Sequence, residues 1–259
     1  SKVLTALALS RLELEGKVKL SDTLRASLPE QITLAKGLEP VTLLHLATHT
    51  SGLPRLPGNL DRSPASLENP YAKYRVSELN QFLAEVKVNN PPGRMVDYSN
   101  VGFALLGQVL ARKAGMPFEE LVRGTVLEPL GMTNTVIRLA DGQRARLAAG
   151  HSPQGEVVRG WDFDAFAPAG AFHSTLGDLL VLVEANLAEP DTVVGRALTH
   201  ARTLRSVGEA GDLPLGWQRQ VDFQTGLEVY WHNGGTGGFA GPVGSVAGNA
   251  APVATTGAT

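Results

Sequence analysis

The chain has 259 residues, of which 43% are hydrophobic, and its 23 Lys and Arg nearly balance its 25 Asp and Glu. This length and apolar content suffice for one large buried core, and the lack of a basic surplus argues against a nucleic-acid partner or an anionic membrane surface. The chain contains no cysteine, which excludes a thiol nucleophile, a disulfide framework and thiolate metal ligands.

Apolar residues recur at helical spacing in several segments of the chain. The first such segment ends at Gly16, and a later one ends at Gly115, both suitable residues for closing a helix. A further segment follows Ser174 and Thr175, either of which can cap a helix N-terminus. The periodicity predicts helices over residues 3–15, 42–52, 76–86, 101–114 and 118–126, and from residue 174 or 175 onwards.

Alternating apolar and polar residues late in the chain predict a hairpin. Residues 215–220 and 227–232 alternate, and "DFQTG" between them supplies a turn. Shorter strands are expected over 136–139 and 157–161. Residues 240–259 consist of small and uncharged residues with little surface to bury, so we expect a disordered tail there.

The stretch "DYSN" places Tyr98 two residues before Asn100, in a loop that leads into a predicted helix. The two side chains can be directed into one cleft, and Tyr98 can serve as acid or base if nearby cations lower its pKa from ~10 toward neutrality. A simpler interpretation is that Ser99 or Asn100 caps the helix beside a half-buried aromatic ring.

Lys2 lies in the first turn of the first predicted helix. The helix macrodipole disfavours an added positive charge at this end and therefore lowers the pKa of an amine, which makes Lys2 a candidate base. Lysines at such positions are, however, usually solvated.

The stretch "HNGGTGGF" sets His232 at the end of a predicted strand and follows it with four glycines within eight residues. Without Cβ atoms, the backbone at Gly234 and Gly235 allows a substrate to approach and offers unhindered N–H groups to an oxyanion. The simpler alternative is a glycine-rich hairpin that carries a surface histidine.

These segments occur in a recognisable order. A Lys at a helix start is followed by "HTSGLP", "PPGRMVDYSNVGFALLG", "PAGAFHSTLGDL" and "HNGGTGGF". This order resembles the serine β-lactamase and penicillin-binding superfamily, in particular its class C-like branch with D-alanyl-D-alanine carboxypeptidases and esterases. The resemblance covers residues 1–239 and implies an α/β (α+β) fold in which helices flank an antiparallel sheet beside a mostly helical region.

The resemblance also implies a division of the chain. Residues 1–239 would form the domain, with a helical part over about 20–170 and a sheet part made of 1–19 and 171–239, while 240–259 would be the tail. Family members have strands before the first core helix and after the closing strand, and this chain shows neither set. The sheet is therefore expected to be incomplete, with an open edge.

Roles for single residues follow from the family motifs. In the family's Ser-x-x-Lys motif the first Ser is the nucleophile, and Lys2 matches the motif's Lys with Ser1 as its third residue. The nucleophile would then stand two positions before Ser1, one helical turn from Lys2 and on the same helix face. As written, the chain is expected to have little or no activity.

The remaining motifs supply the other site residues. Tyr98 would exchange the proton, and Asn100 would hold the substrate amide and the lysine. His232, Asn233 and Gly234 stand where many β-lactamases have Lys-Thr-Gly, and Gly235 would donate its N–H to the oxyanion. A His at the first of these positions resembles the carboxypeptidase-like and esterase-like relatives more than dedicated β-lactamases.

The implied activity is two-step acyl transfer on a peptide, ester or β-lactam carbonyl, without a metal or another cofactor. The partner would be a small molecule or peptide, and the oligomeric state stays open. No apolar run reaches the ~20 residues that span a bilayer, and no signal peptide is recognisable. We expect the chain to begin inside a longer protein, and the family suggests the cell envelope.

Other interpretations remain open. "HLATH" gives His45 and His49 the i,i+4 spacing of a metal pair, but Leu46 stands where a zinc protease needs Glu. Gly235, Gly237 and Ala240 fit a loose dinucleotide pattern with no helix after it.

The strongest rival is a non-catalytic member of the same fold that binds a carboxylate or a peptide terminus. A further candidate nucleophile, Ser51, has little support, because its surroundings are typical of a helix end and the chain has no G-x-S-x-G motif.

Overall fold

The computed structural model of the protein describes residues 1–188, 190–247 and 253–254. Its longer helices carry most of the core, and short helical turns connect them. The helices are α1 (Lys2–Leu14), α2 (Leu24–Ser27), α3 (Leu43–Ala47), α4 (Pro64–Leu67), α5 (Val76–Glu85), α6 (Asn100–Ala114), α7 (Phe118–Val122), η1 (Arg123–Leu127), α8 (Glu128–Leu130), α9 (Asp141–Arg144), α10 (Ala167–Gly170), α11 (Leu176–Leu187), α12 (Val193–Arg202) and η2 (Gly208–Ala210).

The main sheet is antiparallel, with β5 (Gln218–Val221), β6 (Glu228–Thr236), β7 (Phe239–Ala247) and β8 (Val253–Ala254) in that spatial order. Within the described residues, β5 and β8 form its edges. Two smaller hairpins pair β1 (Gly150–His151) with β2 (Val157–Val158) and β3 (Arg205–Ser206) with β4 (Asp212–Leu213). The prediction of a mixed fold with an antiparallel sheet flanked by helices is confirmed.

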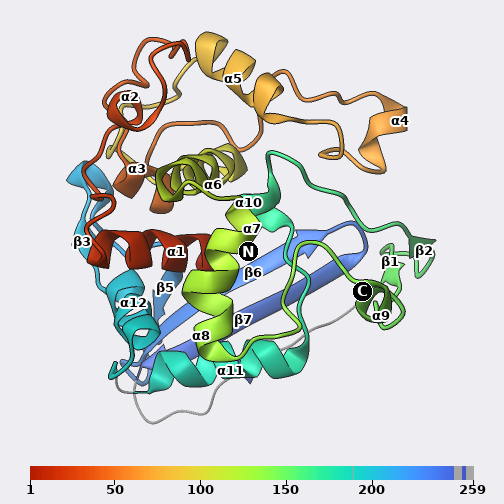
Figure 1. The fold of residues 1–259 in the computed structure, drawn as a ribbon. Coiled ribbons are helices and arrows are strands. Elements are labelled where there is room, and N and C mark those ends of the chain that lie inside the picture. The colour runs from red at the N-terminus through yellow and green to blue at the C-terminus, as the bar shows by residue number, and fades with distance from the viewer. Residues whose placement is uncertain (189, 248–252, 255–259) are drawn as a thin grey trace.

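Helix α1 lies at the centre of the molecule and packs against α6, α10, η1 and α12. In Figure 1 the helices α2, α3, α5 and α6 lie on one side of α1, and the strands β5, β6 and β7 lie on the other. Almost every residue of α1 from Lys2 to Leu12 is buried, so this helix has no solvent face. Its surroundings therefore place the first turn, with Lys2, inside the protein.

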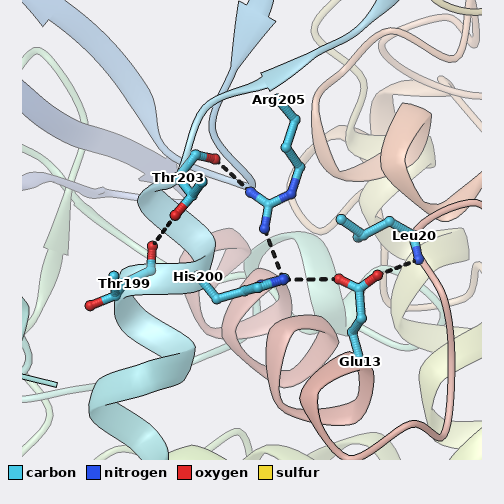
Figure 2. A network of polar contacts seen from close by, with 6 residues as sticks. All are labelled: Glu13, Leu20, Thr199, His200, Thr203 and Arg205. Carbon is cyan, nitrogen blue, oxygen red and sulfur yellow. Dashed lines mark hydrogen bonds and ion pairs between the residues drawn. The ribbon is translucent and has the colours of Figure 1, made fainter. Parts of the chain in front are cut away.

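Polar contacts hold the far end of α1 against α12 and β3, as Figure 2 shows. Glu13 accepts a hydrogen bond from the backbone N–H of Leu20 at 2.8 Å, and its second carboxylate oxygen lies 3.0 Å from Nε2 of His200. Arg205 approaches the same ring nitrogen at 2.9 Å. Burial and the charge of Arg205 lower the pKa of His200, while Glu13 opposes them. These contacts help to fix the axis of α1.

The predicted helices occur with shifted ends. The helix expected over 42–52 ends at Ala47, because the chain turns away at Thr48 and His49. The segment expected over 118–126 continues to Leu130 through a π-helical turn over 123–127. Of the strand expected over 136–139, only a single bridge between Val136 and His173 forms.

The predicted disordered tail is wrong over 240–247, which belong to β7. The prediction counted side-chain burial alone, whereas these small residues are held by backbone pairing along the whole length of β6, from Glu228 opposite Ala247 to Thr236 opposite Phe239. Strand β8 pairs with β7 in turn. Residues 248–252 and 255–259 lie outside the described residues.

Candidate active site

A cavity of about 930 Å³ opens where α1 begins, between α10, α11 and the strands β6 and β7. Every site residue expected from the sequence lines it: Lys2, Tyr98, Asn100, His232, Asn233, Gly234 and Gly235. Lys2, Arg55 and Arg146 give the wall positive groups, and none of the described lining residues is Asp or Glu. The chemistry of the cavity therefore suits an anionic ligand.

The amine of Lys2 is held inside this cavity wall. Lys2 is 7% exposed, and its Nζ donates a hydrogen bond to the carbonyl oxygen of Ala169 in α10 at 2.8 Å. Burial, reinforced by the positive charge of Arg55, lowers the pKa of Lys2 to about 7. A substantial part of the amine is therefore neutral near pH 7 and able to accept a proton.

Tyr98 lies beside that amine. The Nζ atom of Lys2 is 5.2 Å from the centroid of the Tyr98 ring, and the guanidinium carbon of Arg55 is 5.1 Å from the same centroid. The sequence suggested that nearby cations would lower the pKa of this phenol. Instead its pKa is raised, because burial outweighs the opposing charge of Arg55. Lys2, and not Tyr98, is thus the stronger candidate base.

The turn that carries Tyr98 is fixed by the start of α6. The Ser99 hydroxyl accepts a hydrogen bond from the N–H of Gly102 at 2.9 Å and donates one to the carbonyl of Pro54 at 2.7 Å. Asn100 is the first residue of the helix, and its N–H binds the carbonyl of Arg55 at 3.1 Å. Both interpretations of "DYSN" therefore hold together: Ser99 caps α6, and the same turn places Tyr98 and Asn100 at the cavity.

His232 reaches the cavity from β6. It is 8% exposed, and its ring centroid is 6.3 Å from that of Tyr98. Its Nδ1 lies 2.5 Å from the carbonyl oxygen of Asn233, and because a carbonyl only accepts, the ring proton belongs on Nδ1. Burial, with the nearby charge of Lys2, lowers the pKa of His232 to about 3. The ring is neutral at pH 7, with Nε2 as an acceptor that has no partner among the described residues.

The glycines after His232 serve two purposes. A Cβ atom at Gly235 would meet nothing within 4 Å, and one at Gly234 would only approach the carbonyl of Gly241 at 4.0 Å. A Cβ atom at Gly237, in contrast, would lie 2.7 Å from the carbonyl oxygen of Arg159. Gly234 and Gly235 thus leave backbone open at the cavity, whereas Gly237 permits the hairpin turn to pack against its neighbours.

The alternative chemistries do not match the local geometry. His45 and His49 do not share a helical face, because α3 ends between them: Nδ1 of His45 accepts from the N–H of Thr42, and Nδ1 of His49 accepts from that of Ser99. No group of three potential metal ligands occurs within the described residues.

The dinucleotide pattern falls on the β6–β7 hairpin, where no helix begins. Ser51 is completely buried, and its hydroxyl accepts from the N–H of Leu53. These positions therefore offer no competing active site.

Three contributors to this site were not found from the sequence. Arg55 follows "HTSGLP" and lines the cavity beside Tyr98, Tyr71 contributes a buried ring to the wall, and Ala169 provides the acceptor for Lys2. The "PAGAF" segment contributed to the family resemblance, but the acceptor that it provides for Lys2 is a backbone carbonyl, and every residue type has one. Arg55 was detectable only as an arginine beside a quoted motif.

Comparison with known proteins settles the family. Residues 1–245 match the family model described as Beta-lactamase. The chain belongs to the β-lactamase family. The D-alanyl-D-alanine-carboxypeptidase/endopeptidase AmpH of Escherichia coli is 29% identical over 258 residues, which cover 92% of this chain and 64% of AmpH. A β-lactamase of Lysobacter lactamgenus is 30% identical over 72% of this chain and 45% of its own length. The chain thus spans less than two thirds of these relatives.

Solved structures agree with this assignment of the β-lactamase fold. The β-lactamase/D-alanine carboxypeptidase from Yersinia pestis, complexed with citrate, superposes with a TM-score of 0.80 at 29% identity, over 94% of this chain and 71% of that one. A class C β-lactamase superposes with a TM-score of 0.77 at 22% identity, over 94% and 70% of the two chains. The second likeness concerns the fold alone. In the described part of this family member, no helix is long and apolar enough to cross a membrane.

Proposed function

We propose that this β-lactamase family chain carries the proton-transfer and oxyanion groups of a serine acyl-transfer site that acts on peptide or ester carbonyls. The observation that carries the proposal is the buried amine of Lys2, whose pKa is lowered to about 7, in a cavity shared with Tyr98 and His232. Such a lowered pKa suits a general base at neutral pH.

The proposed first step is attack of a serine hydroxyl on the substrate carbonyl carbon. Family resemblance puts that serine two positions before Ser1, one helical turn from Lys2. The neutral amine of Lys2 can donate one N–H to Ala169 and still accept the serine proton with its lone pair. Tyr98 then passes its proton to the leaving group, which fits the neutral phenol implied by its raised pKa, and regains a proton from the Lys2 ammonium.

The second step is hydrolysis of the acyl-enzyme. Water attacks the acyl carbon and gives its proton to the neutral Lys2 amine, a proton from the Lys2 ammonium passes to the serine oxygen as the acyl bond breaks, and the acid product departs. In both steps the oxyanion would receive a hydrogen bond from the backbone N–H of Gly235, a residue that lines the cavity and whose Cβ position is open. Removing one such donor in comparable sites costs about 10²–10³ in rate.

The proposed substrate carries a carboxylate near the scissile bond. Arg55 and Arg146 line the cavity, whose described lining residues include no Asp or Glu. The ring of His232 is neutral and adds no positive charge for a second carboxylate, and its Nε2 is covered by the described residues. Because His232 stands where many β-lactamases have Lys, and a His there resembles the carboxypeptidase-like and esterase-like relatives, we rank peptide and ester hydrolysis above β-lactam hydrolysis.

The proposal is tested with three proteins: the 259-residue chain, the chain preceded by Ser-Val, and the chain preceded by Ala-Val. Each is incubated with fluorescent penicillin and with a fluorophosphonate, and covalent adducts are detected by intact mass. Only the Ser-Val protein should form an adduct. Equal labelling of the unextended chain would show that the nucleophile has been placed wrongly, and no labelling of a folded Ser-Val protein would contradict acyl transfer.

A second candidate function is reversible binding of a carboxylate or peptide terminus. The observation in its favour is the basic cavity lining, which would attract such a group without any nucleophile. Calorimetry with a peptide ending in D-Ala-D-Ala separates the two functions. Saturable binding with no turnover by the Ser-Val protein would favour the binding module over the hydrolase.

A further inference from the structure

His49 contacts three consecutive residues of the "DYS" turn. Its carbonyl oxygen accepts from the N–H of Asp97 at 2.7 Å, and its Nδ1 accepts from the N–H of Ser99 at 3.0 Å. Between these two bonds, its ring stacks on Tyr98 with the centroids 4.2 Å apart and the planes 29° from parallel. One residue thus holds the backbone on both sides of Tyr98 as well as the ring itself.

The backbone of His49 is itself unusual. It is the one non-glycine residue with a positive φ, at 59°, in the part of the chain that the structure describes. Residues other than glycine occupy this region at a cost of roughly 1 kcal/mol or more, and they persist there only where the surroundings determine the conformation. The conformation directs the ring toward Tyr98, and Phe103 contacts the imidazole with the centroids 4.9 Å apart.

The protonation state of His49 is compatible with a permanent contact. A backbone N–H donates to Nδ1, so the neutral ring carries its proton on Nε2. Burial, together with the charges of Lys2, His232 and Arg55, lowers the pKa of His49 to about 3. The Nδ1 acceptor and the stacked ring are therefore retained throughout the neutral pH range.

We propose that His49 is a positioning residue that fixes the direction of the Tyr98 phenol in the cavity. Its catalytic consequence rests on the proposed role of Tyr98 in proton transfer, whereas its structural consequence does not. Without the stack and the Ser99 bond, the phenol would be free to turn away from Lys2. Misplacement of a reacting group by about 1 Å can cost ~10² in rate.

Two substitutions separate the contributions of His49. His49→Asn keeps a short acceptor near the position of Nδ1 and a residue that tolerates positive φ, but it removes the stacked ring. His49→Phe keeps a ring and removes the acceptor. The matched control is His45→Asn, because Nδ1 of His45 also accepts from a backbone N–H, that of Thr42, whereas the histidine rings that pack near Tyr98 are those of His49 and His232.

The main readout is the Tyr98 ring resonance in protein labelled with ¹³C-tyrosine, assigned by its loss in Tyr98→Phe. We expect the signal to move and broaden in both His49 variants and to stay in place in His45→Asn, although all three lose some thermal stability. An unmoved signal in folded His49→Asn would overturn the proposal. If neither variant folds, nuclear Overhauser contacts between the His49 and Tyr98 rings in the unchanged chain decide, since their absence also overturns it.

Kinetics in the Ser-Val protein provide an independent readout. His49→Asn should lower the acylation rate about 10-fold to 100-fold with little change in KM, whereas His45→Asn should leave both nearly unchanged. An unchanged acylation rate in His49→Asn would overturn the catalytic consequence. If the Ser-Val protein itself forms no adduct, the proposed function fails, while the ring resonance still tests whether His49 positions Tyr98.

Discussion

The amine of Lys2 donates a hydrogen bond to the carbonyl oxygen of Ala169 at 2.8 Å and joins the first turn of α1 to α10, 167 residues away. A carbonyl can satisfy one N–H of the amine but cannot neutralise an ammonium ion. The buried group therefore loses most of its preference for the charged form, in agreement with its pKa of about 7. Protein stability and Lys2 protonation must then be linked.

We expect Lys2→Met to remove that linkage. The pKa of Lys2 is lower in the folded chain than its ordinary value of 10.5, so the unfolded chain binds more protons between these pH values, and stability rises with pH in this window. Between pH 7 and 9.5, the free energy of unfolding of the original chain should rise by about 3 kcal/mol more than that of Lys2→Met. Urea unfolding at each pH measures the difference.

Lys17→Met is the control for this measurement, because the Lys17 amine is largely exposed and pairs with Glu15 at the surface. It should follow the pH dependence of the original chain. Parallel stability curves for Lys2→Met and the original chain would mean that the amine of Lys2 is charged in the folded state at pH 7, and Lys2 would then be unsuited to act as a base.

Arg55 is expected to influence both the ligand and the base. Arg55→Gln removes a charge that contributes to the lowered pKa of Lys2, so that pKa should rise. It should also weaken binding of N-acetyl-D-alanine about 10-fold, as expected for a lost hydrogen bond to a charged group, while the corresponding amide binds as before. Calorimetry with both compounds measures this.

Arg146→Gln is the companion variant, because the guanidinium of Arg146 also lines the cavity but donates to the side-chain oxygen of Asn134 at 2.8 Å. Its effect on carboxylate binding should be smaller than that of Arg55→Gln. If the acid and the amide lose affinity equally in Arg55→Gln, Arg55 contributes to the shape of the cavity and does not recognise the carboxylate.

The sequence predicted several of the longer helices and which side chains share the cavity, but it predicted neither α12 nor β7. Lys2, Tyr98 and His232 lie in segments with distinct motifs, and helical periodicity placed the first of these segments correctly in α1. Family order then brought together three segments that no local pattern relates. The sequence therefore predicted well those features that depend on the type and spacing of side chains, namely amphipathic helices and motif residues.

The features that escaped prediction depend on the backbone or on burial. Strand β7 is held by pairing with β6, not by the composition of residues 240–247. The positive φ of His49 occurs at a residue type for which it is uncommon. The raised pKa of Tyr98 results from competition between burial and the charge of Arg55, and the sequence revealed neither the depth of burial nor that distance.

His232 should make the fold sensitive to acid. Its pKa is lowered to about 3 in the folded chain, so its contribution to stability is complete above the unfolded value of 6.5 and is lost as the pH falls toward 3. Between pH 7 and 4, the free energy of unfolding of His232→Gln should therefore fall by about 3 kcal/mol less than that of the original chain. Denaturant unfolding measures this.

The control is His151→Gln, which alters a histidine of β1 outside the lining of the cavity. Its stability should change with pH as that of the original chain does. Equal acid sensitivity of all three proteins would contradict burial of a neutral His232.

The glycine run permits a matched pair of substitutions. Gly235→Ala adds a methyl group to open space and keeps the backbone N–H, so it should leave the thermal midpoint nearly unchanged and lower acylation of the Ser-Val protein only through contact between the new methyl group and a substrate lying along β6. Gly237→Ala brings a methyl group within 2.7 Å of both the Arg159 carbonyl and the Trp161 ring, so it should destabilise the fold by about 1–3 kcal/mol. Thermal unfolding and adduct formation, measured on both variants, test whether Gly235 affects the reaction and Gly237 the stability of the fold. Full acylation by Gly235→Ala would show that no part of the substrate lies against the Cβ position of Gly235.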